Sequence, residues 1–193
     1  MQNGPRVFLS EDRSGGFWLF CIAMANLADI KLLAMDVDGV LTDGAIIVGS
    51  DGAESKFFNS QDGHGIRLWQ RAGLKVALLS GRALGPAKHR ARELEIEYIF
   101  EDCHYKLPVL EKLLAQLGLS PGNAAYIGDD LPDLPVIRYV GFGVAVANAV
   151  DEVKQYADYV TACPGGKGAV REVVEYVLKN TGKWQELMKR YLA

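Results

Sequence analysis

From Ile30 onward, short apolar runs alternate with longer stretches in which apolar residues recur every three or four positions. Continuous apolar strands that alternate with amphipathic helices are typical of β-α-β units around a parallel sheet. We therefore predict an α/β domain with a doubly wound parallel sheet and helices on both faces. The four runs that read as buried strands are "IKLLAMDV" at 30–37, "LKVALLS" at 74–80, "AAYIG" at 124–128 and "FGVAV" at 142–146.

The polar and apolar spacing also predicts helices and one insertion. "LPVLEKLLAQLG" at 107–118 places its apolar residues on one helical face and ends at a glycine, and "GKGAVREVVEYVLKN" at 166–180 carries a valine stripe. "KWQELMKRYL" at 183–192 predicts a last short helix. By contrast, "AIIVGSDGAESKFFN" at 45–59 predicts a short β-hairpin inserted after the first strand. The insertion is too short to form a separate lid domain, but it could cover a site or form an oligomer edge.

Composition narrows the class of protein. A chain of 193 residues with 49% hydrophobic residues can bury one core of ordinary size. The net charge of −3 gives no general attraction for nucleic acid or for an anionic membrane. The 3 cysteines form no C-x-x-C pair and the 3 histidines share no metal-ligand spacing, which argues against a disulfide framework and a zinc site. A reducing, cytoplasmic location is predicted.

The amino-terminal segment differs from the rest of the chain. "FWLFCIAMA" at 17–25 is an apolar block that is too short to span a bilayer. A signal peptide is the alternative, because "AMA" resembles a cleavage site, but Glu11 and Asp12 are unlike a basic leader. We predict that residues 1–26 are an N-terminal extension, disordered or ahead of the true start, and that residues 27–193 form one domain.

Polar and charged residues follow the predicted strands. Doubly wound sheets bind ligands beyond the carboxyl ends of their strands, so these residues are expected to converge on one rim. Lys106 precedes a predicted helix and can reach the same rim. The candidate residues are Asp36 and Asp38 in "DVDGVLTDG", Ser80, Gly81 and Arg82 in "LLSGR", and Asp129, Asp130 and Asp133 in "GDDLPD".

This set of side chains suits metal-assisted phosphoryl transfer. Mg²⁺ prefers oxygen ligands, which Asp36, Asp129 and the backbone carbonyl of Asp38 can supply. The Asp36 carboxylate can attack phosphorus, while Asp38 protonates the leaving oxygen and later deprotonates water. Ser80 is expected to hydrogen-bond a phosphate oxygen, and Lys106 to offset the negative charge of the nucleophile and the phosphoryl group.

Each of these residues also has a plain structural interpretation. Asp36 and Asp38 can be ordinary turn acids, Ser80 can cap a strand-to-helix turn, and Lys106 can be an exposed lysine. Their occurrence in order at successive strand ends favours a site.

The acids that follow the third predicted strand are divided by role. Asp129 and Asp130 can both be helix caps. We assign Asp129 to the metal, Asp130 to its support, and Asp133 to a supporting or structural role.

The ordered motifs "DVDGVLTDG", "LLSGR", Lys106 and "GDDLPD" resemble those of the haloacid dehalogenase superfamily of phosphatases. With "DGHGI" at 62–66 and "PGGKGAVRE" at 164–172, the chain resembles the 3-deoxy-D-manno-octulosonate 8-phosphate phosphatases from Leu27 onward. This resemblance implies a Rossmann-like three-layer domain without a large cap, a homotetramer assembled through the hairpin, and Mg²⁺ dependence. It also implies a role in making the inner sugar of lipopolysaccharide.

The sequence says less about which residues recognise the substrate. The Arg82 guanidinium suits bidentate binding of a sugar-acid carboxylate or a phosphate, and Gly81 lies beside it. Asp62 is either the cap of the "GIRLWQRAG" helix or a substrate contact. The resemblance suggests that "PGGKG" approaches a neighbouring subunit's site, with Lys167 and Arg171 as candidates.

The leading hypothesis is a phosphomonoesterase that acts on the 8-phosphate of 3-deoxy-D-manno-octulosonate. One alternative keeps the mechanism but takes a related nonulosonate 9-phosphate. The other is a non-catalytic oligomeric regulatory domain that retains the metal site, a hypothesis weakened by the presence of every catalytic residue.

Overall fold

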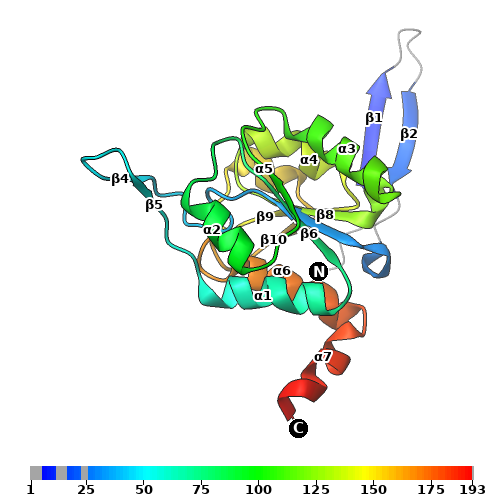
Figure 1. The fold of residues 1–193 in the computed structure, drawn as a ribbon. Coiled ribbons are helices and arrows are strands. Elements are labelled where there is room, and N and C mark those ends of the chain that lie inside the picture. The colour runs from blue at the N-terminus through cyan, green and yellow to red at the C-terminus, as the bar shows by residue number, and fades with distance from the viewer. Residues whose placement is uncertain (1–5, 12–16, 23–25, 193) are drawn as a thin grey trace.

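A six-stranded parallel sheet lies at the centre of the computed structural model, which describes residues 6–11, 17–22 and 26–192 (Figure 1). Each strand pairs in parallel with its neighbours, which confirms the predicted sheet. The edge strands β7 and β10 were not predicted, because three and two residues are too few to show a pattern. In spatial order the strands are β10 (Tyr159–Val160), β9 (Phe142–Ala145), β8 (Ala124–Gly128), β3 (Leu32–Met35), β6 (Lys75–Leu79) and β7 (Tyr98–Phe100).

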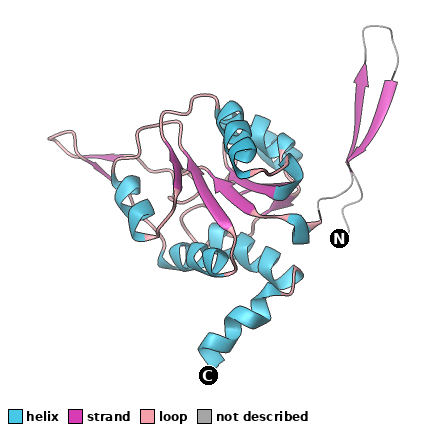
Figure 2. Ribbon diagram, turned by 45° about the vertical axis from the view of Figure 1, so that its right-hand side comes forward, coloured by secondary structure: helices cyan, strands magenta, loops and turns pink. Residues whose placement is uncertain are grey.

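Helices cover both faces of the sheet and complete the three layers (Figure 2). Helices α1 and α6 pack together on one face, and α3, α4 and α5 lie on the other (Figure 1). No helix in the described part of the chain is long and apolar enough to cross a membrane. The helices are α1 (Ser60–Arg71), α2 (Pro86–Glu93), α3 (Lys106–Leu117), α4 (Leu134–Tyr139), α5 (Asp151–Tyr156), α6 (Ala169–Asn180) and α7 (Lys183–Leu192), with 3-10 turns η1 (Leu27–Asp29), η2 (Pro121–Asn123) and η3 (Leu131–Asp133).

The central strand β3 is buried along its whole length, which explains its uninterrupted apolar sequence. Leu32, Leu33, Ala34 and Met35 are all fully buried, because helices cover both faces of the sheet. Each leucine removed from water in this way contributes about 1.5–3 kcal/mol to folding. The strand therefore fixes the position of the polar loop that follows it.

Two helix starts differ from the sequence prediction. Helix α6 begins at Ala169 because Gly166 and Gly168 have φ angles of 65° and 107°, in the left-handed region that a right-handed helix cannot contain. Helix α1 begins at Ser60, and the Asn59 side chain accepts the first free N–H groups. Of the two alternatives considered for Asp62, the cap of this helix is therefore wrong.

The predicted hairpin is present and projects from the body of the molecule (Figure 1). Strands β4 (Ile47–Val48) and β5 (Glu54–Ser55) pair in an antiparallel manner immediately after the loop that follows β3. The structure shows no cap domain among the described residues, as expected for so short an insertion.

A separate antiparallel ribbon precedes the domain. It consists of β1 (Arg6–Glu11) and β2 (Phe17–Ile22), which pair with each other and not with the six-stranded sheet. The other parts of the predicted extension, residues 1–5, 12–16 and 23–25, lie outside the described residues. The division of the chain at residue 27 stays a prediction.

Candidate active site

The sheet changes its winding direction between β3 and β8, and the predicted acids lie at that point. The chain runs from β3 outward to β6 and β7, then returns to β8 and continues outward to β9 and β10. Asp36 directly follows β3 and Asp129 directly follows β8. The Asp36 N–H donates to the carbonyl of Ile127, at 3.0 Å, so the two strand ends are held side by side. Ligands of doubly wound sheets bind in this position.

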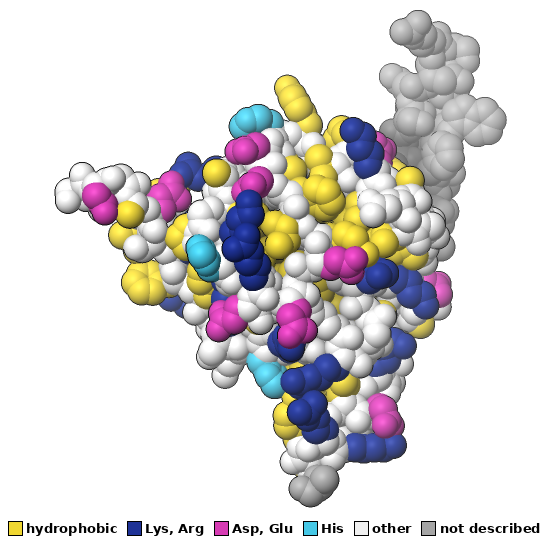
Figure 3. Space-filling model, viewed as in Figure 1, with side chains coloured by type: hydrophobic (Ala, Val, Ile, Leu, Met, Phe, Trp, Pro, Cys, Tyr) yellow, Lys and Arg dark blue, Asp and Glu magenta, His cyan; other side chains and the backbone are white. Residues whose placement is uncertain are grey.

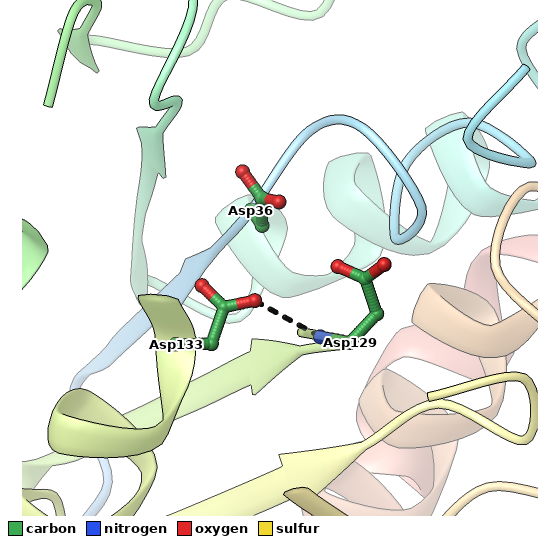
Figure 4. A group of neighbouring side chains, drawn as sticks. All are labelled: Asp36, Asp129 and Asp133. Atoms are coloured by element: carbon green, nitrogen blue, oxygen red, sulfur yellow. Dashed lines mark hydrogen bonds between the residues drawn. The ribbon is translucent and has the colours of Figure 1, made fainter. Parts of the chain in front are cut away.

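Three carboxylates gather there (Figure 4). Asp36 comes from the end of β3, Asp129 from the end of β8 and Asp133 from η3. One oxygen from each lies within 4.8 Å of the others. Three acids this close are stable only with cations or hydrogen-bond donors among them.

Asp133 is the residue of the cluster whose hydrogen bonds hold the neighbouring groups in place. One carboxylate oxygen accepts from Lys106 Nζ at 2.7 Å and from the Tyr126 hydroxyl at 2.6 Å. The other accepts the N–H groups of Asp129 at 3.0 Å and Asp130 at 3.3 Å. The side chain is fully buried and fully engaged, so it positions the β8 end and Lys106. Tyr126 was not predicted, although a tyrosine in a buried strand usually needs a partner for its hydroxyl.

Lys106 links Asp133 to Asp36, the predicted nucleophile. Its ammonium, with 3% of the side chain exposed, lies 2.7 Å from Asp133 and 2.8 Å from Asp36. Burial lowers the pKa of Lys106, but the charges of Asp133 and Asp36 outweigh burial and raise it overall. The interpretation of Lys106 as an exposed lysine is therefore wrong.

The electrostatics of the remaining two acids fit a bound cation. Burial first, and then the negative charges of Asp36 and Asp133, raise the pKa of Asp129 to about 8. Burial and the Asp133 charge raise the pKa of Asp36 to about 6, against the lowering effect of Lys106. Asp129 Oδ1 is buried and has no hydrogen-bond partner. An unpaired buried carboxylate oxygen beside a second carboxylate is a donor set that suits a hard, oxygen-preferring divalent cation.

Residues 36–44, named the catalytic loop because they include the predicted nucleophile and the predicted acid/base, pass close to Asp129. Gly39 has φ +96°, and a Cβ there would lie 2.0 Å from Asp129 Oδ2, so only glycine lets the loop pass so close. The buried Thr42 hydroxyl accepts from the N–H groups of Gly39 and Gly44 and steadies the turn. The Asp38 carboxylate pairs with Lys56 from the hairpin, a partner that the sequence did not reveal.

Ser80, Gly81 and Arg82 follow β6 at the same edge of the sheet. Ser80 is buried, and its hydroxyl donates to the Arg82 carbonyl at 2.9 Å while accepting the Arg82 N–H at 3.2 Å. The Arg82 guanidinium is half exposed and pairs with Glu54 of the hairpin at 2.8 Å. The predicted phosphate contact of Ser80 and substrate contacts of Gly81 and Arg82 stay predictions.

Two of the four other predicted residues are acids that cap helical turns. Asp130 is exposed and accepts the N–H of Leu131, as the cap of η3. Asp62 is fully buried, and its two oxygens accept the N–H groups of Gly168 and Arg171, at 3.1 and 2.9 Å. Asp62 therefore caps α6 from a distant helix, a geometry that does not favour direct contact with substrate.

The other two are the basic candidates of the glycine-rich loop, residues 164–168, and the helix after it. The loop lies against the catalytic loop, since the Gly166 N–H donates to the Val40 carbonyl at 2.9 Å. Lys167 is exposed and lies 3.9 Å from Asp43. The Arg171 guanidinium pairs with Glu175 at 2.6 Å, along α6. Lys167 is thus near the rim, whereas the Arg171 guanidinium is engaged by Glu175 and by the ring of Trp184 in α7.

The fold and the site define a haloacid dehalogenase-like hydrolase, and a family profile of that description matches residues 99–173. A relative from Escherichia coli, "3-deoxy-D-manno-octulosonate 8-phosphate phosphatase KdsC", is 44% identical over 163 residues, 84% of this chain and 87% of the relative. The chain belongs to the family of 3-deoxy-D-manno-octulosonate 8-phosphate phosphatases.

Solved structures agree with this assignment. A probable yrbi family phosphatase from Pseudomonas syringae superposes with a TM-score of 0.86 at 46% identity, over 88% of this chain and 97% of that one. The phosphatase from Moraxella catarrhalis, solved in complex with magnesium ion, phosphate ion and a KDO molecule, has a TM-score of 0.84 at 41% identity. That likeness covers 87% of this chain and 97% of the other.

Proposed function

We propose that this chain is a Mg²⁺-dependent phosphomonoesterase that hydrolyses 3-deoxy-D-manno-octulosonate 8-phosphate to the free sugar acid and phosphate. The observation that carries the proposal is the buried arrangement of Asp36, Lys106, Asp133 and Asp129 at the switch point of the sheet. The family relationship, and the magnesium, phosphate and sugar acid named for the Moraxella catarrhalis protein, support the choice of metal and substrate.

Asp36 and Asp129, with the backbone carbonyl of Asp38, would hold the cation. When bound, Mg²⁺ supplies positive charge that stabilises the negative oxygens of the phosphoryl group. Asp133 has no oxygen left for this purpose, because four donors already engage its carboxylate. Its function is to hold the backbone of Asp129 and the ammonium of Lys106 in place.

The reaction proceeds by two displacements at phosphorus. The Asp36 carboxylate attacks phosphorus and forms an aspartyl phosphate, while the sugar oxygen leaves with a proton from Asp38. A water molecule then attacks the same phosphorus and gives its proton to Asp38. The bond between phosphorus and the Asp36 oxygen breaks, so phosphate is released and the Asp36 carboxylate is restored. Lys106 orients Asp36 and offsets the charge that accumulates beside it. Ser80 would hydrogen-bond a phosphate oxygen.

Recognition of the sugar acid would fall to groups on the rim. Arg82, half exposed beside Gly81, would bind the substrate carboxylate in exchange for its Glu54 partner. Lys167 is exposed and would add a second positive charge, in its own or a neighbouring subunit's site. Asp62 and the Arg171 backbone would act through the glycine-rich loop that they hold, and not by touching substrate.

We also propose a homotetramer assembled through the hairpin, and a cytoplasmic role in making a lipopolysaccharide precursor. Hydrophobic side chains lie at the surface of the projecting hairpin (Figure 3). Ile46, Val48 and Phe57 have exposures of 50%, 59% and 67%, which is unusual for so short a segment and suits an interface. Sedimentation of the purified protein, alone and with Val48 and Phe57 both replaced by aspartate, tests the assembly.

The first experiment measures phosphate release across a panel of sugar phosphates, with Mg²⁺ and then with EDTA. We expect Mg²⁺-dependent preference for 3-deoxy-D-manno-octulosonate 8-phosphate over a nonulosonate 9-phosphate, expressed as kcat/KM. Asp36→Asn should abolish turnover and leave the fold intact by circular dichroism. Equal kcat/KM on the two substrates would contradict the choice of substrate. No phosphate release from any member of the panel would favour a regulatory domain.

A further inference from the structure

The base of the hairpin is tied to two loops of the active site at once. Lys56, the residue after β5, pairs its ammonium with the Asp38 carboxylate in the catalytic loop. Two residues earlier, Glu54 pairs with Arg82, the residue two positions after Ser80, at 2.8 Å. A segment that reads from sequence as a possible oligomer edge therefore also contacts the predicted acid/base and the predicted substrate-binding arginine.

The alternation of the hairpin's return segment explains how it makes both contacts. Along an extended chain, successive side chains point to opposite sides. Glu54, Lys56 and Phe58 are partly buried, whereas Ser55 and Phe57 between them are exposed. The first set therefore faces the body of the enzyme, and Phe57 faces away from it with 67% of its surface exposed.

The Lys56 contact differs from an ordinary surface ion pair. Only 3% of the lysine side chain and 18% of the Asp38 side chain are exposed. A lysine ammonium withdrawn from water to this extent requires a charged or hydrogen-bonding partner, and removing either partner leaves an uncompensated buried charge. The Glu54–Arg82 pair, with exposures of 30% and 48%, is more hydrated and easier to exchange.

Lys56 and Lys106 pair with different carboxylates of the site. Lys106 contacts Asp36 and Asp133, and Lys56 contacts Asp38. In their ionised forms, the four acids Asp36, Asp38, Asp129 and Asp133 face two ammonium groups, which leaves a charge that one divalent cation balances. Lys56 is thus the group that constrains the side chain assigned to proton transfer.

We infer that Lys56 is a positioning residue for the reaction, which holds the Asp38 carboxylate in one orientation so that the hairpin is part of the active site. The inference rests on the proposed function, since it concerns the acid/base step of a phosphomonoesterase. Proton transfer needs the donor and acceptor atoms within hydrogen-bond reach, and a carboxylate free to rotate meets that condition less often.

The test compares Lys56→Met, which keeps the length and removes the charge, with Lys56→Arg, which keeps the charge. Lys88→Met is the matched control, because Lys88 makes an exposed ion pair with Glu101. Each variant is assayed on the sugar acid phosphate and on p-nitrophenyl phosphate. The second substrate releases p-nitrophenolate, which leaves without a proton, so the first displacement no longer needs an acid.

For Lys56→Met we expect kcat on the sugar acid phosphate to fall on the order of 10- to 100-fold with KM within about twofold of wild type. On p-nitrophenyl phosphate, stopped-flow should show a burst of p-nitrophenolate at nearly the wild-type rate, followed by slow turnover, because water activation still needs Asp38. Lys56→Arg should recover part of the loss, and Lys88→Met should match wild type. The Mg²⁺-dependent rise in Tm should persist in Lys56→Met.

Two results would overturn the inference. One is a Lys56→Met enzyme with wild-type kcat on both substrates. The other is a Lys56→Met enzyme in which the burst rate, the turnover and the Mg²⁺-dependent Tm shift all decline together, while Lys56→Arg recovers none of them. That result would show that Lys56 only supports the fold. Failure of the proposed function gives a distinguishable result. The wild-type enzyme would then release no phosphate from the sugar acid phosphate, and the comparison on p-nitrophenyl phosphate would still decide the role of Lys56.

Discussion

Replacing Lys106 by methionine tests the electrostatic description of the carboxylate cluster. The ammonium lies 2.8 Å from Asp36 and 2.7 Å from Asp133, and the lysine side chain is 3% exposed. At an effective dielectric constant of about 20, each contact carries roughly 6 kcal/mol of attraction. Lost hydration offsets much of this, so truncation of one partner of a buried pair costs about 3–5 kcal/mol.

We therefore expect Lys106→Met to lower the free energy of unfolding by about 3–5 kcal/mol in EDTA, which corresponds to a fall in Tm of about 6–20 °C for a chain of this size. The deficit should be smaller with Mg²⁺, because a bound cation takes over part of the charge neutralisation. Urea unfolding with and without Mg²⁺ measures both quantities.

Lys88→Met is the control here also, since its exposed pair with Glu101 should contribute at most about 1 kcal/mol. A loss for Lys106→Met that is no greater than for this control would refute the description of the cluster. So would a deficit that Mg²⁺ leaves unchanged.

Two further predictions concern the loops around the site. Gly39→Ala should reduce kcat on the order of 100-fold and weaken the Mg²⁺-dependent Tm shift, because its Cβ would displace the Asp129 carboxylate. Gly52→Ala, with φ +81° but open space around it, should cost stability alone. Although burial raises the pKa of Glu172, hydrogen bonds from the Ala162 and Cys163 N–H groups outweigh it and lower that pKa below its ordinary value of 4.5. Its contribution is therefore present above pH 4.5 and lost as the pH falls through the lowered pKa. Glu172→Gln should accordingly be less stable than wild type at pH 7, with a difference that narrows in acid unfolding curves; a constant difference would contradict this.

Much of the fold and the centre of the site could be predicted from local patterns. The apolar runs of β3, β6, β8 and β9 are long enough to read as buried strands, and polar residues directly follow three of them. Because parallel strands end at a common edge, the order of Asp36, Ser80 and Asp129 along the chain already implied one rim. The edge strands β7 and β10 were too short to leave such a pattern.

The partners of these residues could not be predicted, because they join segments that only the folded topology brings together. Asp62 caps a helix more than a hundred positions further along the chain, which neither of the two alternatives considered for it, a cap of its own helix or a substrate contact, had foreseen. Lys56 meets Asp38 because the chain passes the catalytic loop again as it leaves the hairpin after β5. Sequence by itself determined the four inner strands of the sheet and the polar residues that follow three of them. The tertiary structure decided which charges neutralise one another, because a hydrogen bond or ion pair depends on a few ångströms of separation that distance along the chain does not encode.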